Sequence, residues 1–254
     1  MSAETQKTPS TVDDYVDLLG ALAGLGIEFV VIGGCAVGAY ARLMGEQVLS
    51  ADLDLLVTWR SLESVVADAS TIGLRVEKMP QPRTIPVALL EWRGREINLL
   101  TGSSGLPPPD VAARAAREFR LGRGTEITVL IADPFDLLRN KLAVNRPKDQ
   151  PHIAILRRFL DEEAVSGFSQ EKEPRARISA AERLLEVLGT QTLEDDLANR
   201  LLPLATTVAD FRFLAHRVPV HLLRQLRDRA QADDIRKAVE RIATIRGTAL
   251  SGDS

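Results

Sequence analysis

The stretch of residues 27–57, IEFVVIGGCAVGAYARLMGEQVLSADLDLLV, decides the fold of this chain. It begins with a short apolar run, Phe29–Ile32, which ends in Gly33 and Gly34 and leads into a helix-like segment at residues 36–43. Glycine lets a ligand approach the backbone closely, and the unpaired N–H groups at the start of a helix favour phosphate. The pattern therefore predicts a strand, a phosphate-binding turn and a helix.

A second apolar run in this stretch carries two aspartates, Asp52 and Asp54, with only Leu53 between them. Because side chains alternate along a strand, both carboxylates point to one face, whereas Leu53, Leu55 and Val57 point into the core. Neighbouring carboxylates repel each other unless a cation lies between them. The pair predicts a divalent metal site, and magnesium prefers oxygen ligands and shares its shell with phosphates.

Gly33-Gly34 and the later segment Ser50-Ala51-Asp52-Leu53-Asp54 together resemble the signature of the nucleotidyltransferase fold, the DNA polymerase β superfamily. The resemblance implies an α/β (α+β) domain with a mixed sheet flanked by helices. It also implies that Gly33, Gly34 and Ser50 bind the triphosphate and that Asp52 and Asp54 bind magnesium. The plainer alternative is an ordinary glycine turn beside a solvated strand face.

The third strand of this fold usually supplies another carboxylate, and the corresponding run here is residues 95–100, REINLL. The aspartate position falls on Asn98, whose amide cannot replace the lost charge. Glu96 lies two residues earlier on the same strand face and becomes the candidate general base for the incoming hydroxyl. A base from another segment, or a loss of activity, is the alternative that Asn98 leaves open.

Residues 136–149 add a second resemblance, to the later motifs of the abortive-infection (AbiEii-type) nucleotidyltransferase toxins and related bacterial nucleotidyltransferases. In those proteins a helical lysine and a downstream aspartate complete the active site, and these correspond to Lys141 and Asp149. Arg146 and Lys148 are then further phosphate contacts, since lysine is a point charge and arginine grips phosphate with two hydrogen bonds.

The two resemblances imply a magnesium-dependent enzyme that transfers a nucleoside monophosphate from a nucleoside triphosphate to a hydroxyl acceptor. The toxin-like motifs make RNA, such as tRNA, one candidate acceptor and a cognate antitoxin protein a partner. A small molecule or a protein hydroxyl is the alternative acceptor. His152 stands where the related pattern has an acidic residue, and Lys141 is alternatively a surface lysine on an amphipathic helix. The rival hypothesis is therefore a catalytically inactive nucleotidyltransferase fold that binds a nucleotide or a protein partner.

The composition of the 254-residue chain narrows the function classes. Its net charge of -3 lacks the overall basic character that accompanies a large nucleic-acid interface. Cys35 is the only cysteine, so no internal disulfide forms, and a buried thiol in a reducing compartment is expected. No apolar run reaches the roughly 20 residues that span a membrane, and residues 1–14 lack the apolar core of a signal peptide. A cytoplasmic protein without membrane contact is expected.

The chain is expected to contain a disordered lead-in at 1–10, a nucleotidyltransferase-like domain at 11–165, a charged linker at 166–177 and an all-helical region at 178–254. In the domain, the patterns predict helices at 12–24, 61–72 (capped by Ser61), 111–119 and 135–144 (capped by Asp133), a proline-rich loop at 80–86, a hairpin at 87–92 and 96–100, and a strand at 125–131. In the last region they predict helices at 178–188, 193–204, 208–215 and 220–245.

Overall fold

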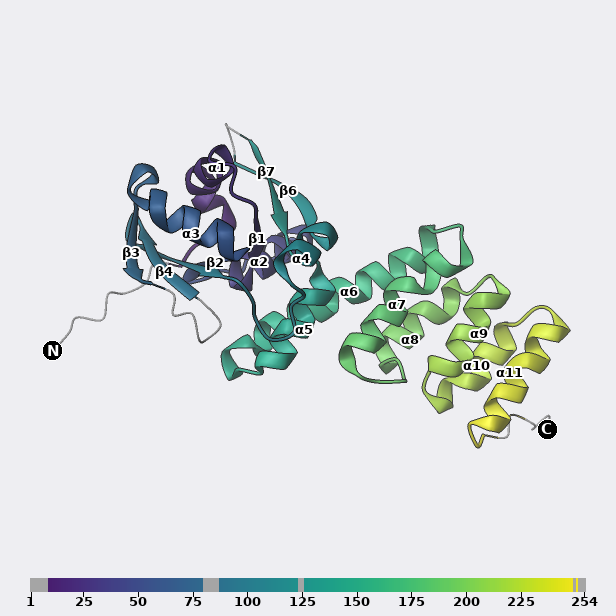
Figure 1. The fold of residues 1–254 in the computed structure, drawn as a ribbon. Helices are drawn as coiled ribbons and strands as arrows, with labels where there is room; N and C mark the ends of the chain where they lie inside the picture. The colour runs from purple at the N-terminus through teal and green to yellow at the C-terminus, as the bar shows by residue number, and fades with distance from the viewer. Residues whose placement is uncertain (1–8, 80–86, 123–125, 249, 251–254) are drawn as a thin grey trace. The chain divides into compact units, whose positions relative to one another are not determined.

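The computed structural model describes residues 9–79, 87–122, 126–248 and 250. Its contacts divide the chain into two compact units, Met1–Arg157 and Arg158–Ser254. The expected proline-rich loop and most of the expected lead-in lie outside the described residues. In the described chain, every named strand belongs to the first unit, and the second unit is helical (Figure 1). The expected α/β domain with a helical C-terminal region is confirmed.

The first unit is built on a mixed sheet. Its described strands are β1 (Phe29–Ile32), β2 (Asp52–Val57), β3 (Leu74–Lys78), β4 (Val87–Trp92), β5 (Arg95–Leu100), β6 (Arg117–Leu121) and β7 (Ile127–Ile131). They follow the order β3-β4-β5-β2-β1-β7-β6, so β3 and β6 form the edges (Figure 1). β1 pairs antiparallel with β2 and parallel with β7, and β2 pairs parallel with β5. β1 and β2, the strands of residues 27–57, therefore lie inside the sheet.

The first unit also contains several helices. These are η1 (Val12–Tyr15), α1 (Val16–Gly24), α2 (Gly33–Leu43), α3 (Trp59–Asp68), η2 (Ala69–Ile72), α4 (Pro109–Ala115), α5 (Pro134–Val144), η3 (Pro147–Asp149) and the start of α6 (Gln150–Gln170). α2 contacts β1, β2 and α5, α4 contacts β1, and α1 contacts β7. Through its contacts, α2 joins the glycine turn to the aspartate strand and to the lysine helix.

Two local structures follow their sequence signals closely. Arg93 and Gly94 have positive φ angles of 51° and 77°, as a tight hairpin turn between β4 and β5 requires. The Asp133 carboxylate accepts a hydrogen bond from the backbone N–H of Phe135 (3.1 Å) and caps α5. Asp133 thus caps the helix that carries Lys141, as the sequence predicts.

The structure differs from the expected elements mainly at the sheet edges. The alanine-rich run predicts a helix at 111–119, but α4 ends at Ala115 and Phe119 lies in β6. β6 pairs with β7 along its whole length and buries Phe119, so strand pairing overrides helix propensity. β3, which is not among the predicted strands, pairs with β4 at the other edge. The cap of α3 is Thr58 rather than Ser61, because the Thr58 hydroxyl accepts the Ser61 N–H (3.1 Å).

The second unit contains the rest of α6 and seven further described helical elements. These are α7 (Pro174–Leu188), α8 (Asp195–Leu201), η4 (Leu202–Leu204), α9 (Val208–Arg217), η5 (Val220–Leu222), α10 (Leu223–Arg229) and α11 (Asp233–Ile245). The single helix expected at 220–245 is wrong. The backbone leaves the helical region at Ala230, with ψ of 109°, and α11 restarts after Ala232.

Residues 166–177, expected as a linker, contain the end of α6 and the start of α7. Arg177 is buried there, and its Nε donates to Asp210 Oδ1 (3.0 Å). The same guanidinium donates to the backbone carbonyls of Glu171 and Leu204. A buried ion pair of this kind is costly to break, because its partner is left without compensation. Arg177 therefore belongs to the packing of the second unit, whose boundary falls earlier, at Arg157/Arg158.

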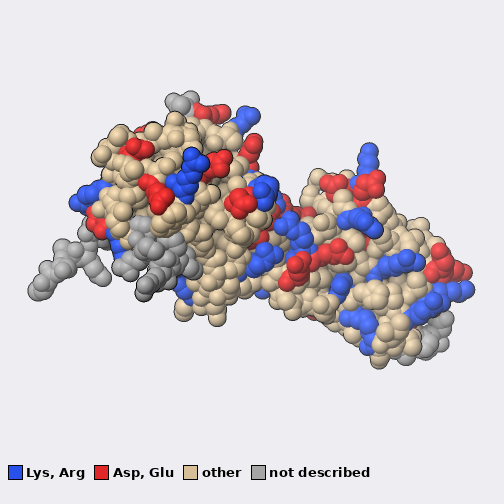
Figure 2. Space-filling model, viewed as in Figure 1, with Lys and Arg blue, Asp and Glu red and all other residues tan. Residues whose placement is uncertain are grey.

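The surface of the described chain carries both signs of charge. Figure 2 shows acidic and basic side chains mixed over the visible face of each unit. This distribution agrees with the small net charge of -3. Among the described helices, none combines the length and the apolarity that crossing a membrane requires.

Candidate active site

The turn between β1 and α2 is shaped by a glycine that has no room for a side chain. Gly33 is the first residue of α2 and has a φ of 69°, so the helix begins three residues earlier than expected. A Cβ atom on Gly33 would lie 2.0 Å from Asp54 Oδ2 and 2.8 Å from Asp54 Cγ. The absence of a side chain at Gly33 thus lets the Asp54 carboxylate pack directly against the start of the helix.

Gly34 makes room for two other polar side chains. A Cβ atom here would lie 2.4 Å from Ser50 Oγ and 3.5 Å from His152 Cε1. The Ser50 hydroxyl donates to Asp52 Oδ1 (3.1 Å). Ser50 is itself held by an isolated bridge to Ser10, with backbone hydrogen bonds in both directions. The glycine pair is therefore surrounded by the aspartates, a serine hydroxyl and an imidazole.

Asp52 and Asp54 lie on one face of β2, as the alternation predicts. Both are partly exposed, whereas Leu53, Leu55 and Val57 are buried. The parallel register places Asn98 of β5 beside Asp54. Asn98 Nδ2 donates to Asp54 Oδ1 (2.9 Å) and lies 3.3 Å from Asp52 Oδ2. The two carboxylates therefore converge closely enough to share a single donor.

The electrostatics of this pair favour a cation. Burial, and then the charge of Asp52, raise the pKa of Asp54 to about 6, although the Asn98 hydrogen bond and the charges of Lys141 and Arg146 act in the opposite direction. The carbonyl oxygen of Asn98, Oδ1, is buried and has no hydrogen-bond partner. Two converging carboxylates and an amide oxygen suit a hard divalent ion such as magnesium.

Few protein side chains at this site could bind a metal ion, and their number indicates which kind of metal site it is. Within the described part of the chain, no group of three or more His, Cys, Asp and Glu side chains is arranged to hold a metal ion. A closed site made by protein ligands alone therefore does not fit. Magnesium commonly takes one or two carboxylates and completes its shell with substrate phosphates and water. The residues present fit that mode of binding.

The raised pKa of Asp54 predicts a pH-dependent stability in the absence of divalent metal. Between its ordinary value of 3.8 and about 6, the folded protein holds a proton that the unfolded chain releases. The unfolding free energy contributed by Asp54 is thus retained at low pH and lost as the pH rises through this range, by about 3 kcal/mol at most. Urea unfolding between pH 4 and pH 7 measures this loss. In Asp54→Asn the loss should shrink, and an unchanged slope would contradict the assignment.

A second cluster is centred on Asp149, which is buried in η3. Lys141 Nζ donates to Asp149 Oδ1 (2.9 Å), with both side chains almost fully buried. Arg146 Nε donates to Asp149 Oδ2 (2.7 Å). Burial opposes ionisation, but the hydrogen bonds from Arg146 and Lys141 outweigh it and lower the pKa of Asp149 to about 2. The chain turns back between the two residues at Asn145, which has a φ of 49°.

The two clusters lie close enough to influence each other. The charges of Lys141 and Arg146 both lower the pKa of Asp54. His152, in the first turn of α6, lies near Asp149 on one side and Gly34 on the other. Residues from β1, α2, β2, β5, α5, η3 and α6 thus meet around the glycine turn. Lys141 is a buried, paired lysine, so it is not the surface lysine that the sequence allowed.

The other residues considered in the sequence analysis, Glu96, Lys148 and Cys35, lie around the two clusters. Glu96 lies beside Asp52 in the parallel register of β2 and β5, on the same face of the sheet. Lys148 is exposed at the surface of η3. Cys35 is buried as expected, its Sγ donates to the backbone carbonyl of Asp52 (3.4 Å), and burial raises its pKa to about 12. A thiol with that pKa is a poor nucleophile at neutral pH.

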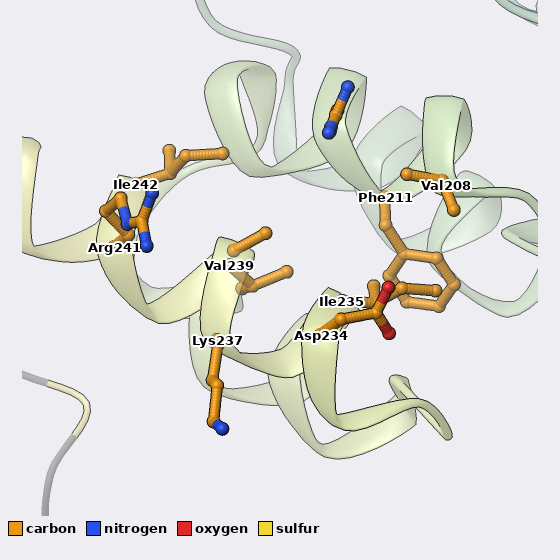
Figure 3. Close-up of a pocket in the computed structure, with 10 residues that line it drawn as sticks. Val208, Phe211, Asp234, Ile235, Lys237, Val239, Arg241 and Ile242 are labelled. Atoms are coloured by element: carbon orange, nitrogen blue, oxygen red, sulfur yellow. The ribbon is translucent and has the colours of Figure 1, made fainter.

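The second unit has a pocket of its own, between α9 and α11, with a volume of about 350 Å³. Figure 3 shows Phe211 of α9 beside Asp234 and Ile235 of α11. Its floor is apolar, and Arg212 and Arg241 are among its exposed lining residues. None of the residues expected at the active site lines this pocket.

No known protein family and no curated protein sequence matches the chain. Among solved structures, it is similar to an antigenic nucleotidyltransferase-like protein from Paracoccidioides brasiliensis, with 18% identity, 76% of this chain and 94% of that chain covered, and a TM-score of 0.42. It is also similar to the antibiotic-resistance factor ANT(2'')-Ia, with 14% identity, 68% and 92% covered, and a TM-score of 0.41. A candidate nucleotidyltransferase from Thermotoga maritima gives 16% identity, 60% and 96% covered, and a TM-score of 0.35. At these scores the similarity is distant and does not by itself identify a function.

Proposed function

We propose that the first unit is a magnesium-dependent nucleotidyltransferase. It transfers a nucleoside monophosphate from a nucleoside triphosphate to a hydroxyl acceptor and releases pyrophosphate. The observation that carries this proposal is the convergence of Asp52 and Asp54 at the glycine-initiated start of α2, where Asn98 Oδ1 is left without a partner. A pair of carboxylates that needs a cation, next to unpaired helix N–H groups that favour phosphate, suits a magnesium-bound triphosphate.

Each part of the site has a role in this reaction. The backbone N–H groups that follow Gly33 and Gly34, with the Ser50 hydroxyl, bind phosphate oxygens. Asp52 and Asp54 would hold the magnesium ion, and the carbonyl oxygen of Asn98 would join them once the amide turns over, since its Nδ2 now faces the carboxylates. When bound, magnesium neutralises charge on the triphosphate and on the pyrophosphate leaving group.

The cationic cluster serves the triphosphate. Lys141 is held in place by Asp149, and Arg146 uses the same carboxylate as its anchor while half of its side chain stays exposed. Arg146 and the exposed Lys148 can therefore reach a ligand without first breaking a buried contact. Positive charges of this kind stabilise the charge that develops on the leaving pyrophosphate. Asp149 is a positioning residue in this arrangement.

The proposed reaction also needs a general base and an acceptor hydroxyl. Glu96 lies next to Asp52 and is our candidate for the general base that takes the proton of the acceptor hydroxyl. We extend the proposal to RNA, such as tRNA, as the acceptor and to a cognate antitoxin as a cytoplasmic partner, on the resemblance to the toxin family. The mixed charge on the visible surface favours a small RNA footprint over a large one.

One observation favours a second candidate function. Asn98 Nδ2 bridges the two carboxylates, so a neutral amide already satisfies part of the charge that a metal would otherwise neutralise. A protein of this kind could bind a nucleotide or a partner without turnover. Thermal unfolding with each nucleoside triphosphate, with and without magnesium, followed by transfer of an α-phosphate label, separates the two. Magnesium-dependent stabilisation with transfer supports the enzyme, and stabilisation without transfer supports the binding module.

The glycine turn gives a separate prediction about triphosphate binding. Gly34→Val should weaken the binding of a non-hydrolysable triphosphate with magnesium by about tenfold or more, because its Cβ would collide with Ser50 and its branches would fill the phosphate site. Isothermal titration calorimetry measures the affinity. Gly24→Ala is the matched control, since a Cβ there meets nothing within 4 Å. Equal affinity in both variants would mean that the glycines serve only the turn.

A further inference from the structure

His152 is the member of the Asp149 cluster that the proposed reaction leaves without a role. Its Nδ1 lies 3.7 Å from Asp149 Oδ1, which is too long for a hydrogen bond. Both oxygens of Asp149 are already engaged by Lys141 and Arg146. Nδ1 is nevertheless buried and has no hydrogen-bond partner. A buried polar atom in this state needs an explanation, and an absent ligand is one of them.

The position of His152 says which ligand that is. Its Cε1 lies 3.5 Å from the place where a Gly34 side chain would begin, at the start of α2. Among the buried side-chain polar atoms of the described chain, only His152 Nδ1 and Asn98 Oδ1 lack a partner. They belong to residues on the two sides of the glycine turn. An oxygen on the acidic side suits a cation, and an imidazole on the cationic side suits a phosphate.

The surroundings of this imidazole disfavour its charged form. Burial is the main cause that lowers its pKa below the ordinary 6.5, and the charges of Lys141 and Lys148 lower it further. Asp149 acts in the opposite direction but is outweighed. Arg146 adds a further positive charge on the same carboxylate. A phosphate beside Gly34 would reverse this balance, since a nearby anion favours the charged form of histidine.

We propose that His152 contacts the triphosphate at the glycine turn and takes up a proton from solvent when the triphosphate binds. This inference rests on the proposed function, because it assigns His152 to the phosphate site of that reaction. The step is a proton transfer: a ring nitrogen of His152 forms an N–H bond with a proton released by hydronium or a buffer acid, and the resulting cation donates N–H to a phosphate oxygen. Where the related toxins have an acidic residue, this chain thus has a group whose positive charge is favoured by the bound triphosphate.

Proton uptake makes the affinity depend on pH in a defined direction. Binding should tighten as the pH falls toward and below the ordinary histidine value, because the bound state holds more protons than the free state. The size of this affinity change reports how far the pKa of His152 rises when the triphosphate binds. Loss of a proton from Asp54 on metal binding has the opposite sign, so the two contributions must be separated by a variant.

Calorimetry of the full chain with a non-hydrolysable triphosphate and saturating magnesium separates them. Titrations near pH 6.5 in non-phosphate buffers of different ionisation enthalpy give the number of protons taken up. Wild type should take up more protons than His152→Gln, which keeps an N–H donor but does not titrate in this range. His216→Gln is the matched control, since His216 is an exposed histidine of the second unit, and it should behave as wild type.

The outcomes separate this inference from the function on which it rests. Equal proton uptake in wild type and His152→Gln, with triphosphate bound by both, would overturn the inference and leave the nucleotidyltransferase intact. Absence of triphosphate binding by wild type would overturn the proposed function and the role of His152 together. Reduced binding in His152→Gln without any difference in proton uptake would make His152 a neutral contact, which also contradicts the proposal.

If His152→Gln does not fold, nuclear magnetic resonance of the wild-type protein tests the same proposal. The chain has 3 histidines, so their Cε1–H signals can be assigned by elimination with His216→Gln and His221→Gln. In wild type, the His152 signal should titrate below 6.5 without ligand and move to higher pH when the triphosphate and magnesium are added. The other two signals should not move. If the pH midpoint of the His152 signal did not change on addition of the triphosphate and magnesium, the proposal would be overturned.

Discussion

Transfer activity should fall by at least about a thousandfold in Asp52→Asn and in Asp54→Asn, a loss of about 4 kcal/mol in transition-state stabilisation. Each change removes one of the two carboxylates that converge on Asn98 Nδ2. Neither variant should be less stable than wild type in the absence of metal, because the substitution removes one charge from a repulsive pair. Label transfer from an α-labelled triphosphate measures the activity, and urea unfolding measures the stability.

Asp110→Asn is the matched control for the metal pair. Asp110 is an exposed carboxylate of the same unit that pairs with Arg114 on the surface (3.3 Å). Its loss should leave activity near wild type and change stability by less than about 1 kcal/mol. If Asp52→Asn or Asp54→Asn kept full activity while the control behaved as expected, the carboxylate pair would not be the metal site.

The second large effect concerns the buried pair of Lys141 and Asp149. Asp149→Ala should lower the unfolding free energy by about 3–5 kcal/mol, because it strands the buried ammonium of Lys141. Lys141→Met should cost less, since Asp149 keeps its hydrogen bonds to Arg146. Both variants should reduce transfer by about tenfold or more, a loss of about 1.4 kcal/mol. Urea unfolding and initial rates measure the two effects.

The double variant decides whether Lys141 and Asp149 act as a unit. With both charges gone, Lys141→Met with Asp149→Ala should be more stable than Asp149→Ala alone, and its transfer rate little lower than that of the worse single variant. Arg114→Met is the control in the same unit, because both side chains of the Arg114–Asp110 pair (3.3 Å) are exposed. It should cost less than about 1 kcal/mol. Strictly additive losses at Lys141 and Asp149 would mean that they work independently.

Much of the fold can be predicted where one short-range pattern dominates. The strand Phe29–Ile32 ends at the glycines as expected, and the alternation of Asp52 with Leu53 gives the buried and polar faces of β2. β6 and β3 escape prediction because each alternates over only two apolar residues, and so short a strand depends on the neighbour with which it pairs. The break at Ala230 escapes because alanine has no helix-breaking signal of its own.

The site is predictable in its residues but not in their contacts. Strand alternation places Asn98 on the face of the aspartates, yet only the register of β2 and β5 shows its amide between them. Pro147 disfavours a continuous helix and so predicts a bend between Lys141 and Asp149, whose side chains meet at 2.9 Å. His152 is visible in the sequence only as a departure from a pattern. Its nearness to Gly34 depends on how α6 packs against α2, which no local signal encodes.

The most direct test of the central claim is a crystal structure of the protein with manganese, as a substitute for magnesium, and a non-hydrolysable nucleoside triphosphate. Anomalous scattering locates the ion independently of the protein atoms. We predict one anomalous peak between the carboxylates of Asp52 and Asp54, within about 2.5 Å of both, with Asn98 Oδ1 turned toward it and the phosphates at Gly33 and Gly34. A nucleotide bound elsewhere, or a bound nucleotide with no manganese at this pair, would contradict the account.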